Sequence, residues 1–296
     1  MRLLFLLALL LPTGLTAQPA ARSLALDHVI VWSIDRDGRR PVVYRAGPMT
    51  LTLRGQRHGE MARLLLTVAQ RGMAPVTLRG EETFGFEQHV SVGRWDARSQ
   101  YVMFQSFSGG AHCCIHISLV MPMRGRLHVV DLGFWDGDFD DEPVRDLNHD
   151  GRLDFVFVDN SFLYAFAPYA ASYAPPQILN VMNGRVVDVS ANPSFRALYE
   201  DSIAHDSREA CVHSDPGGGQ NGACAAYVAA AARVGRFDAA WAEMLHSYDR
   251  NSNWDLPTGC RVDDRARGCP HSDVIHYRDY PDALRHFLIR LHYIRG

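Results

Sequence analysis

The hydrophobic pattern of the chain changes its period once, near Asn192-Pro193, and this change limits the possible folds more than any other feature. Before it, from about residue 24 to 189, short apolar stretches alternate with polar residues and are broken by turn residues, which is typical of β-strands. After it, apolar residues recur at helical spacing. The pattern predicts an α+β protein with an antiparallel β domain at residues 24–192 and a small helical region at residues 193–296.

Eight apolar stretches in the first part have the length and composition of strands. Turn-forming residues separate them at 35–38, 123–125 and 183–184. Residues 95–104 also resemble residues 149–158, either as a repeated unit the size of a propeller blade or by chance similarity between two hairpins. Only about three such units fit into the chain, so we expect a sandwich or a partial propeller. The predicted strands are 29–34, 64–68, 76–78, 90–92, 101–104, 115–120, 127–130 and 155–158.

The second part is predicted to form four helices. The first two are expected at residues 194–210 and 223–234, and the third begins near residue 237. The fourth begins around Pro281, which suits a first turn, with Asp282 favourable to the helix dipole. The last two helices have apolar faces formed by Phe237, Trp241, Met244, Leu245 and Tyr248, and by Leu284, Phe287, Leu288 and Leu291.

The first residues have the composition of a cleavable signal peptide. Arg2 precedes an uninterrupted apolar stretch at residues 3–11, and Ala17 offers a small residue for cleavage, so we predict a signal peptide at residues 1–17. The stretch is too short to span a bilayer, and no later segment is apolar enough to do so. We therefore expect an exported bacterial protein, periplasmic or secreted, whose mature chain has no membrane span.

Cysteines in an exported chain predict disulfides. Spacing favours Cys211 with Cys224 and Cys260 with Cys269, because each pair closes a short loop. The helical region is therefore expected to be held together by disulfides.

The adjacent residues Cys113 and Cys114 allow several interpretations. A bond between them would be strained, because neighbouring Cα atoms lie about 3.8 Å apart whereas disulfides prefer about 4.4–6.8 Å. On a strand, His112, Cys114 and His116 share one face, which would suit zinc or copper. A structural disulfide of either kind, a redox or metal site and a catalytic nucleophile all stay open for this segment.

Residues 146–154, the acidic loop, have the spacing of a calcium-binding loop. Asp146, Asn148, Asp150 and Asp154 occupy positions one, three, five and nine, and Gly151 stands where a metal loop turns sharply. Ca²⁺ is a hard cation that takes about six to eight oxygen ligands, which such a loop can supply. An EF-hand would also need a glutamate at position twelve, where this chain has Phe157, so the loop is not an EF-hand.

The acidic loop resembles the calcium loops of the FG-GAP and VCBS repeat families, in which Asp-x-Asp/Asn-x-Asp-Gly-x-x-Asp runs directly into a strand. The resemblance covers one loop and one strand. It implies a structural Ca²⁺ site with side-chain ligands from Asp146, Asn148, Asp150 and Asp154 and a carbonyl ligand from Arg152. It does not imply an adhesion function.

The charge around the acidic loop supports a bound cation. Between residues 136 and 154 there are eight acids and two arginines, a net charge of −6. Like charges held close repel by about several kcal/mol even at an effective dielectric constant of about 20. The alternative is a solvated acidic turn without an ion.

Aromatic residues follow the last predicted strand at residues 159–169. Tyr164, Phe166 and Tyr169, together with His112 and His116, are candidates for a surface that stacks on carbohydrate or contacts a partner. The alternative is that the aromatic residues belong to the core.

No motif commits the chain to a reaction: it has no Gly-x-Ser-x-Gly, no His-Glu-x-x-His and no phosphate loop. The net charge of −3, with scattered basic residues, predicts no nucleic-acid partner. We therefore predict a non-catalytic protein that binds an envelope or extracellular partner and carries a structural calcium site. The alternative is a secreted hydrolase acting on cell-envelope polysaccharide or peptide, with acids of residues 136–154 or the segment 112–116 in its active site.

Overall fold

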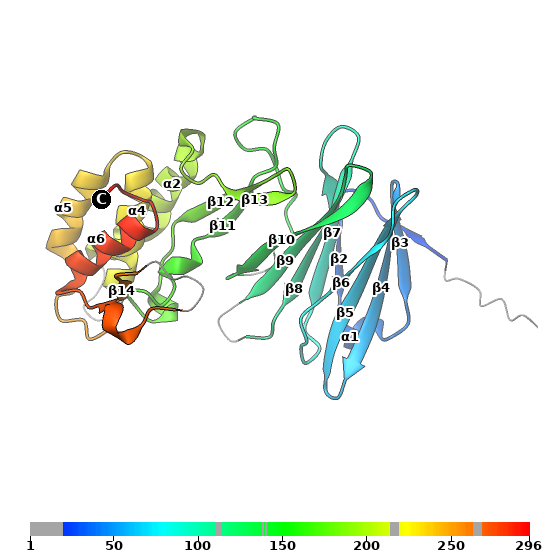
Figure 1. The fold of residues 1–296 in the computed structure, drawn as a ribbon, viewed down its shortest axis with the longest axis horizontal. Coiled ribbons are helices and arrows are strands. Elements are labelled where there is room, and N and C mark those ends of the chain that lie inside the picture. The colour runs from blue at the N-terminus through cyan, green and yellow to red at the C-terminus, as the bar shows by residue number, and fades with distance from the viewer. Residues whose placement is uncertain (1–19, 111–113, 138, 140, 214–218, 263–267) are drawn as a thin grey trace, which may run out of the picture.

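The computed structural model describes residues 20–110, 114–137, 139, 141–213, 219–262 and 268–296. Two five-stranded sheets pack face to face, so the β region is a sandwich rather than a partial propeller (Figure 1). The first sheet has the order β1 (Arg22–Ser23), β3 (Val42–Ala46), β4 (Met49–His58), β5 (Met61–Gln70) and β6 (Val76–Arg79). The second has the order β10 (Arg126–Trp135), β9 (Ile115–Met123), β8 (Gln100–Phe107), β7 (Gln88–Arg94) and β2 (Val29–Trp32).

Strand pairing is antiparallel, as predicted, except that β1 runs parallel to β3. Strict alternation explains the sandwich core: Leu51 and Leu53 on β4 and Leu64 and Leu66 on β5 are fully buried, while the residues between them are not. The predicted turn at residues 35–38 is instead a short helix, α1 (Ile34–Asp37), because Ser33 caps its first turn and Gly38 ends it with φ +70°.

A third sheet covers the outer face of the second sheet. It consists of β11 (Phe155–Val158), β12 (Pro176–Met182) and β13 (Arg185–Asp188), and in Figure 1 it lies between the sandwich and the helices. Ile117 and Leu119 of β9 pack here against Phe155 and Leu179. The second sheet is therefore buried on both faces, which places the acidic loop, just before β11, beside the sandwich.

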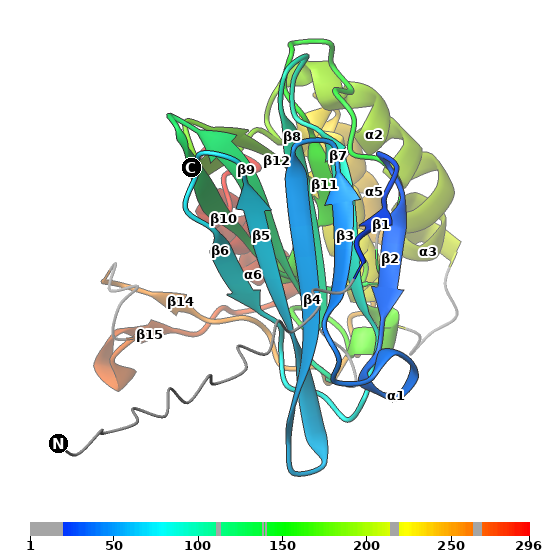
Figure 2. The same cartoon turned by 90° about the vertical axis from the view of Figure 1, so that its right-hand side faces the viewer.

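The helical region begins with a 3-10 turn (Pro193–Phe195) and continues through α2 (Arg196–Ser202), a π-helical segment (Ile203–Ser207) and α3 (Arg208–His213). It goes on with α4 (Gln220–Arg233), α5 (Phe237–Ser247), a hairpin of β14 (Gly259–Cys260) and β15 (Val274–Ile275), and α6 (Tyr280–Arg290). Further 3-10 turns lie at Asn160–Phe162, Tyr169–Ala171 and His271–Asp273. Figure 2, which looks onto the first sheet, shows the helices behind the sheets.

The alanine-rich helix α4 is the centre of this region. Its residues from Asn221 to Ala231 are buried on all sides, because alanine side chains let neighbouring helices approach closely. The core around α4 also includes Phe162, Phe166 and Ile178, which precede the helical region in the sequence.

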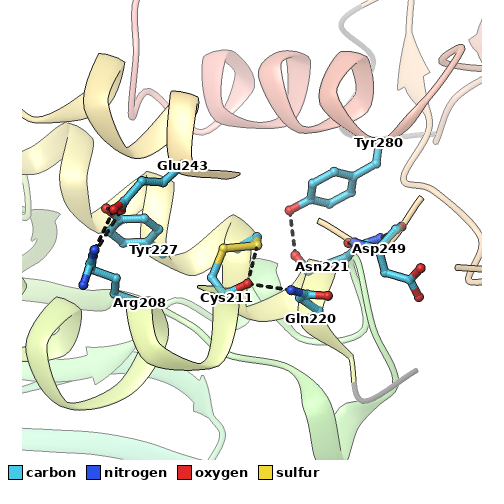
Figure 3. Close-up of a disulfide and its surroundings, with 9 residues drawn as sticks. Arg208, Cys211, Gln220, Asn221, Tyr227, Glu243, Asp249 and Tyr280 are labelled. Atoms are coloured by element: carbon cyan, nitrogen blue, oxygen red, sulfur yellow. Dashed lines mark hydrogen bonds and ion pairs between the residues drawn. A yellow bond between two sulfur atoms is a disulfide. The ribbon is translucent and has the colours of Figure 1, made fainter. Parts of the chain in front are cut away.

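Disulfides hold the helical region together, as predicted. Cys211 of α3 bonds Cys224 of α4 in the buried core, with Cα atoms 4.5 Å apart (Figure 3). Cys260 bonds Cys269, with Cα atoms 5.7 Å apart. Cys114 is disulfide-bonded as well. Cys113 lies outside the described residues, as does the predicted signal peptide.

Within the part of the chain that is described, no helix has both the length and the apolar composition needed to cross a bilayer.

Candidate functional site

The acidic loop is shaped by hydrogen bonds from its own backbone to its acidic side chains. Asp146 accepts from the N–H groups of Asp150, at 3.1 Å, and Gly151, at 2.8 Å. Asn148 accepts from the same Asp150 N–H at 3.1 Å. Gly151 has a φ of +86°, which glycine adopts without strain, so the glycine at position six serves the sharp turn that the sequence suggested.

Asp154 ties the acidic loop to the third sheet. Its side chain is buried, with the residue only 3% exposed. One oxygen accepts from the Leu147 N–H at 2.8 Å, and the other accepts from the Asn180 Nδ2 of β12 at 2.7 Å. Asp154 therefore has a structural role whether or not a cation is bound.

The donor types of the acidic loop suit Ca²⁺: carboxylate and amide oxygens at alternate positions, with an Arg152 carbonyl between them. The carboxylates of the loop are not gathered around one point where a cation could lie. Asp150 instead forms an ion pair with Arg152 at 3.0 Å. Across the described residues, no three His, Cys, Asp or Glu side chains are grouped so that they could hold a metal ion. A cation bound at this loop would compete with Arg152 for the Asp150 carboxylate.

A cluster of aromatic residues lies on the surface near the end of β10. We call Phe134, Tyr164, Tyr169 and Trp254 the aromatic edge. The ring centroids of Tyr164 and Tyr169 are 5.6 Å apart, and those of Tyr164 and Trp254 are 6.5 Å apart with a 23° angle between the rings. Phe134 and Tyr164 are each 47% exposed.

Tyr164 is held in an unusual backbone conformation, with φ +59°. Its N–H donates to the Ser172 Oγ at 3.0 Å, and its carbonyl accepts from the Trp254 Nε1 at 3.1 Å. A non-glycine residue in the left-handed region costs about 1 kcal/mol or more, and such strain clusters at ligand sites.

Asp136 supplies a carboxylate to the aromatic edge. Both of its oxygens lie 2.7 Å from the Tyr169 hydroxyl, which donates to them. The Asp136 N–H donates to the Asn160 Oδ1, and the Asn160 Nδ2 donates to the Phe134 carbonyl at 2.9 Å. These bonds fix the end of β10 against the segment that follows β11.

His116 lies on the rim of the sandwich between two carboxylates. Its Nδ1 is 3.2 Å from Glu81 and its Nε2 is 3.0 Å from Asp131, and its ring stacks on Phe134 at 4.3 Å. The two acidic partners and the stacked ring hold the His116 imidazole beside Phe134. His112, the other predicted histidine, lies outside the described residues.

Phe166 does not belong to the surface, contrary to the expectation for a binding residue. It is 2% exposed and packs edge-on against Tyr280 and Phe287 of α6, with centroids 5.3 and 5.1 Å away. The helical region covers it, which the local aromatic pattern could not indicate. The core interpretation of the aromatic stretch is therefore correct for Phe166.

No local sequence pattern indicated two members of the aromatic edge. Trp254 lies in the segment between α5 and β14, and Phe134 lies at the end of β10. Trp254 has no aromatic neighbour in the sequence, and the fold brings its Nε1 to the Tyr164 carbonyl. Phe134 stands next to Trp135, and its carbonyl is bonded to Asn160 in the segment that precedes Tyr164.

One cavity brings two carboxylates of the hydrolase hypothesis together. Glu142 and Asp154 both line a cavity of about 310 Å³. Asp154 is buried with both oxygens hydrogen-bonded, whereas the Glu142 side chain is 85% exposed beside Arg145. Among the described residues, the cavity thus has one solvent-facing carboxylate and one structural carboxylate, whereas glycoside hydrolysis uses two reactive carboxyl groups. Asp138 and Asp140 of the same segment lie outside the described residues.

The fold defines a class of α+β proteins in which a β-sandwich and a third sheet carry a disulfide-linked helical domain. Residues 200–292 match the sll0997 C-terminal domain. Over 238 residues the chain is 37% identical to the "Probable thylakoid lumen protein sll0997" of Synechocystis sp., and the match covers 78% of this chain and 68% of that protein. The chain therefore belongs to the sll0997 family.

A second relative is the "Uncharacterized protein y4bJ" of Sinorhizobium fredii. It is 29% identical over 263 residues, which make up 87% of this chain and 41% of that protein, so the chain spans less than half of its length. No solved structure matches the chain. The likeness to FG-GAP and VCBS repeats stays confined to the acidic loop and β11, and no such repeat is among the families matched.

Proposed function

We propose that this protein is an exported, non-catalytic binding protein that attaches to an envelope polysaccharide through the aromatic edge. A compartment outside the cytoplasm is supported by its relative sll0997, whose name places that protein in the thylakoid lumen, and by disulfides in the helical region. The strained, exposed Tyr164 carries the proposal, because the fold maintains an unfavourable backbone there to present a ring to solvent.

The chemistry of the aromatic edge suits a sugar chain. Tyrosine and tryptophan offer flat apolar faces with a polar tip, and the Asp136 carboxylate beside Tyr169 is an acceptor for hydroxyl groups. A patch of exposed aromatic residues on a folded protein marks an interaction surface.

We further propose the acidic loop as a structural Ca²⁺ site, with oxygens from Asp146, Asn148, Asp150 and Asp154 and the Arg152 carbonyl as ligands. A bound cation would neutralise the carboxylates that now depend on backbone N–H groups and Arg152. The support is the donor set, the preformed turn at Gly151 and the excess of acids in this segment.

The binding proposal is tested by co-sedimentation with purified peptidoglycan sacculi. We expect the wild-type chain to sediment and a Tyr164→Ser, Trp254→Ala variant to bind at least about thirtyfold more weakly, because the two aromatic residues together carry about 2 kcal/mol or more. The control is Phe84→Ala, since Phe84 is 67% exposed and lies outside the aromatic edge.

Equal binding of the double variant and the wild-type chain would refute the role of the aromatic edge. Release of soluble sugar or peptide fragments by the wild-type chain would instead refute the non-catalytic proposal and favour the hydrolase.

A further inference from the structure

A groove runs along the outer face of the second sheet, apart from the exposed rings of the aromatic edge. It consists of the cavity of about 310 Å³ already described and a second cavity of about 370 Å³. The two share Gln105, Ile117, Val156 and Phe157 as lining residues, so they adjoin each other. We call this the acidic groove.

The shared floor of the acidic groove is largely apolar. Ile117 of β9 and Val156 and Phe157 of β11 line both cavities. In the second cavity, Trp135 stacks on Phe157 with ring centroids 4.1 Å apart, and its Nε1 donates to the Leu132 carbonyl. Since the indole N–H is satisfied within the protein, the exposed ring surface is available for apolar groups of a ligand.

The rim of the acidic groove carries an excess of negative charge. The exposed acids are Asp201 and Asp206 at the second cavity and Glu142 at the first, against Arg145. Asp136 and the buried Asp154 also line the cavities, but their oxygens are already hydrogen-bonded within the protein. The Asp201 side chain is 72% exposed, and its partner His205 offsets the negative charge of Asp201 only when the imidazole is protonated. A cationic ligand above an apolar floor is therefore the complementary occupant.

The π-helical segment places two of these acids on one side. Asp201 and Asp206 are five residues apart, and an i to i+5 hydrogen-bonded turn brings such residues to the same face, whereas an α-helix aligns residues three and four apart. The Ser207 hydroxyl donates to the Ser202 carbonyl at 3.3 Å, which fits the widened turn. Short π-helical segments within α-helices occur frequently at functional sites.

We propose that the acidic groove binds a basic, partly apolar peptide segment of a protein partner. Basic side chains would lie beside Asp201, Asp206 and Glu142, and apolar side chains would lie on Val156 and Phe157. This site adjoins the aromatic edge at Asp136 but includes none of its rings, and the inference does not rest on the polysaccharide proposal.

The test uses fluorescein-labelled pentapeptides and the full chain, measured by fluorescence anisotropy at low salt. The probes are Arg-Leu-Arg-Leu-Arg, Arg-Ser-Arg-Ser-Arg and Glu-Leu-Glu-Leu-Glu. We expect the basic apolar peptide to bind most tightly, the basic polar peptide more weakly and the acidic peptide not at all, with affinity falling as salt rises.

Matched variants locate the site. Asp201→Asn with Asp206→Asn should weaken binding of the basic apolar peptide by about three- to tenfold, because each solvent-exposed charge pair contributes only modestly to affinity. The control Glu209→Gln removes an i,i+4 pair with His213 like the Asp201–His205 pair, but Glu209 does not line the groove, so binding should be unchanged.

Three results would overturn the proposal: no binding of the basic apolar peptide, equal binding of the acidic one, or an unchanged affinity in the Asp201, Asp206 variant. Dimerisation of the wild-type chain that this variant abolishes, seen by light scattering, would assign the groove to a second copy instead. A Tyr164→Ser, Trp254→Ala variant should bind the peptides normally, which separates this result from the sugar test.

Discussion

Asp154 accepts hydrogen bonds from the backbone of its own loop and from a side chain of the neighbouring strand β12. The sequence motif identifies this residue as a candidate ligand, but the second partner, Asn180, lies 26 residues away and follows no local pattern. At the residue scale, spacing predicts which side chains lie in one turn. It does not predict which distant groups satisfy them.

Replacing Asp154 should therefore destabilise the fold in calcium-free buffer. In Asp154→Asn an amide N–H would face the Leu147 N–H or the Asn180 Nδ2, leaving buried donors without an acceptor at a cost of about 1–3 kcal/mol. Urea unfolding measures the loss. The exposed Asp150→Asn variant is the control and should lose less than about 0.5–1 kcal/mol; equal losses would contradict the structural role of Asp154.

Calcium binding should depend on the exposed members of the acidic loop. If the loop is a Ca²⁺ site, ion at about 100 times its dissociation constant stabilises the native chain by about 2.7 kcal/mol and raises its melting temperature. Asp146→Asn with Asp150→Asn should abolish this rise, since it removes two of the carboxylates.

Isothermal titration and melting curves with Ca²⁺ and with chelator check the calcium prediction. Asp96→Asn is the control, because Asp96 makes a similar side-chain turn with Arg98 and Ser99 in another loop. Absence of both heat and a melting shift in the wild-type chain would leave a solvated acidic turn as the correct interpretation.

At the scale of single elements, the alternation of apolar and polar residues predicted strands that are buried on one face only and bounded by turn residues, as in β5. The strands β3, β4, β12 and β13 were not predicted. In β4 the last apolar side chain of the alternation is Leu53 and the next buried position is Gly55, yet pairing with β5 extends the strand to His58. The π-helical segment within residues 194–210 was not predicted either, because tertiary packing decides where a helix widens.

A hydrogen-bonded group joins three of the helices beside the buried disulfide (Figure 3). Arg208 of α3 donates twice to Glu243 of α5, at 3.1 and 2.6 Å, and the Tyr227 hydroxyl of α4 donates to the same carboxylate. The Arg208 and Tyr227 hydrogen bonds hold the pKa of Glu243 below its ordinary value of 4.5. Burial raises the pKa of Tyr227 to about 12, so its hydroxyl stays a donor at neutral pH.

The helical region should accordingly lose stability in acid. A carboxyl group whose pKa is lower in the folded state contributes its full stabilisation above its unfolded-state pKa, and this contribution is lost as the pH falls through the folded-state pKa. Glu243→Gln should lower the free energy of unfolding at pH 7 by about 0.5–1 kcal/mol, a modest value because the pair is partly exposed.

Below about pH 4 the difference between Glu243→Gln and the wild-type chain should shrink, as wild-type Glu243 becomes protonated. Urea unfolding from pH 3 to 7 measures it, with the exposed Glu209→Gln as control. A difference that does not vary with pH would show that the charge of Glu243 is not the source of the stabilisation.

At the scale of the whole molecule, the change of period near residue 192 predicted the order of a β part and a helical part. It could not show that the two share a core. Phe162, Phe166 and Ile178 pack among α4 and α6, whereas Phe155 and Leu179 pack against the second sheet. The third sheet thus contributes side chains to both neighbours, because successive strand residues point to opposite faces.

This sharing leads to a prediction about the domain boundary at residues 192 and 193. A chain of residues 24–192 would expose Phe162, Phe166 and Ile178, which are at most 2% exposed in the whole protein. Uncovering three large apolar side chains costs about 1.5–3 kcal/mol each, so this chain should melt at a lower temperature than the full protein and bind the dye ANS.

Phe162→Ser with Phe166→Ser in the short chain should reduce dye binding without lowering its stability further, because these side chains no longer have a core to fill. A short chain that unfolds cooperatively at the wild-type temperature and binds no dye would establish residues 24–192 as an independent domain.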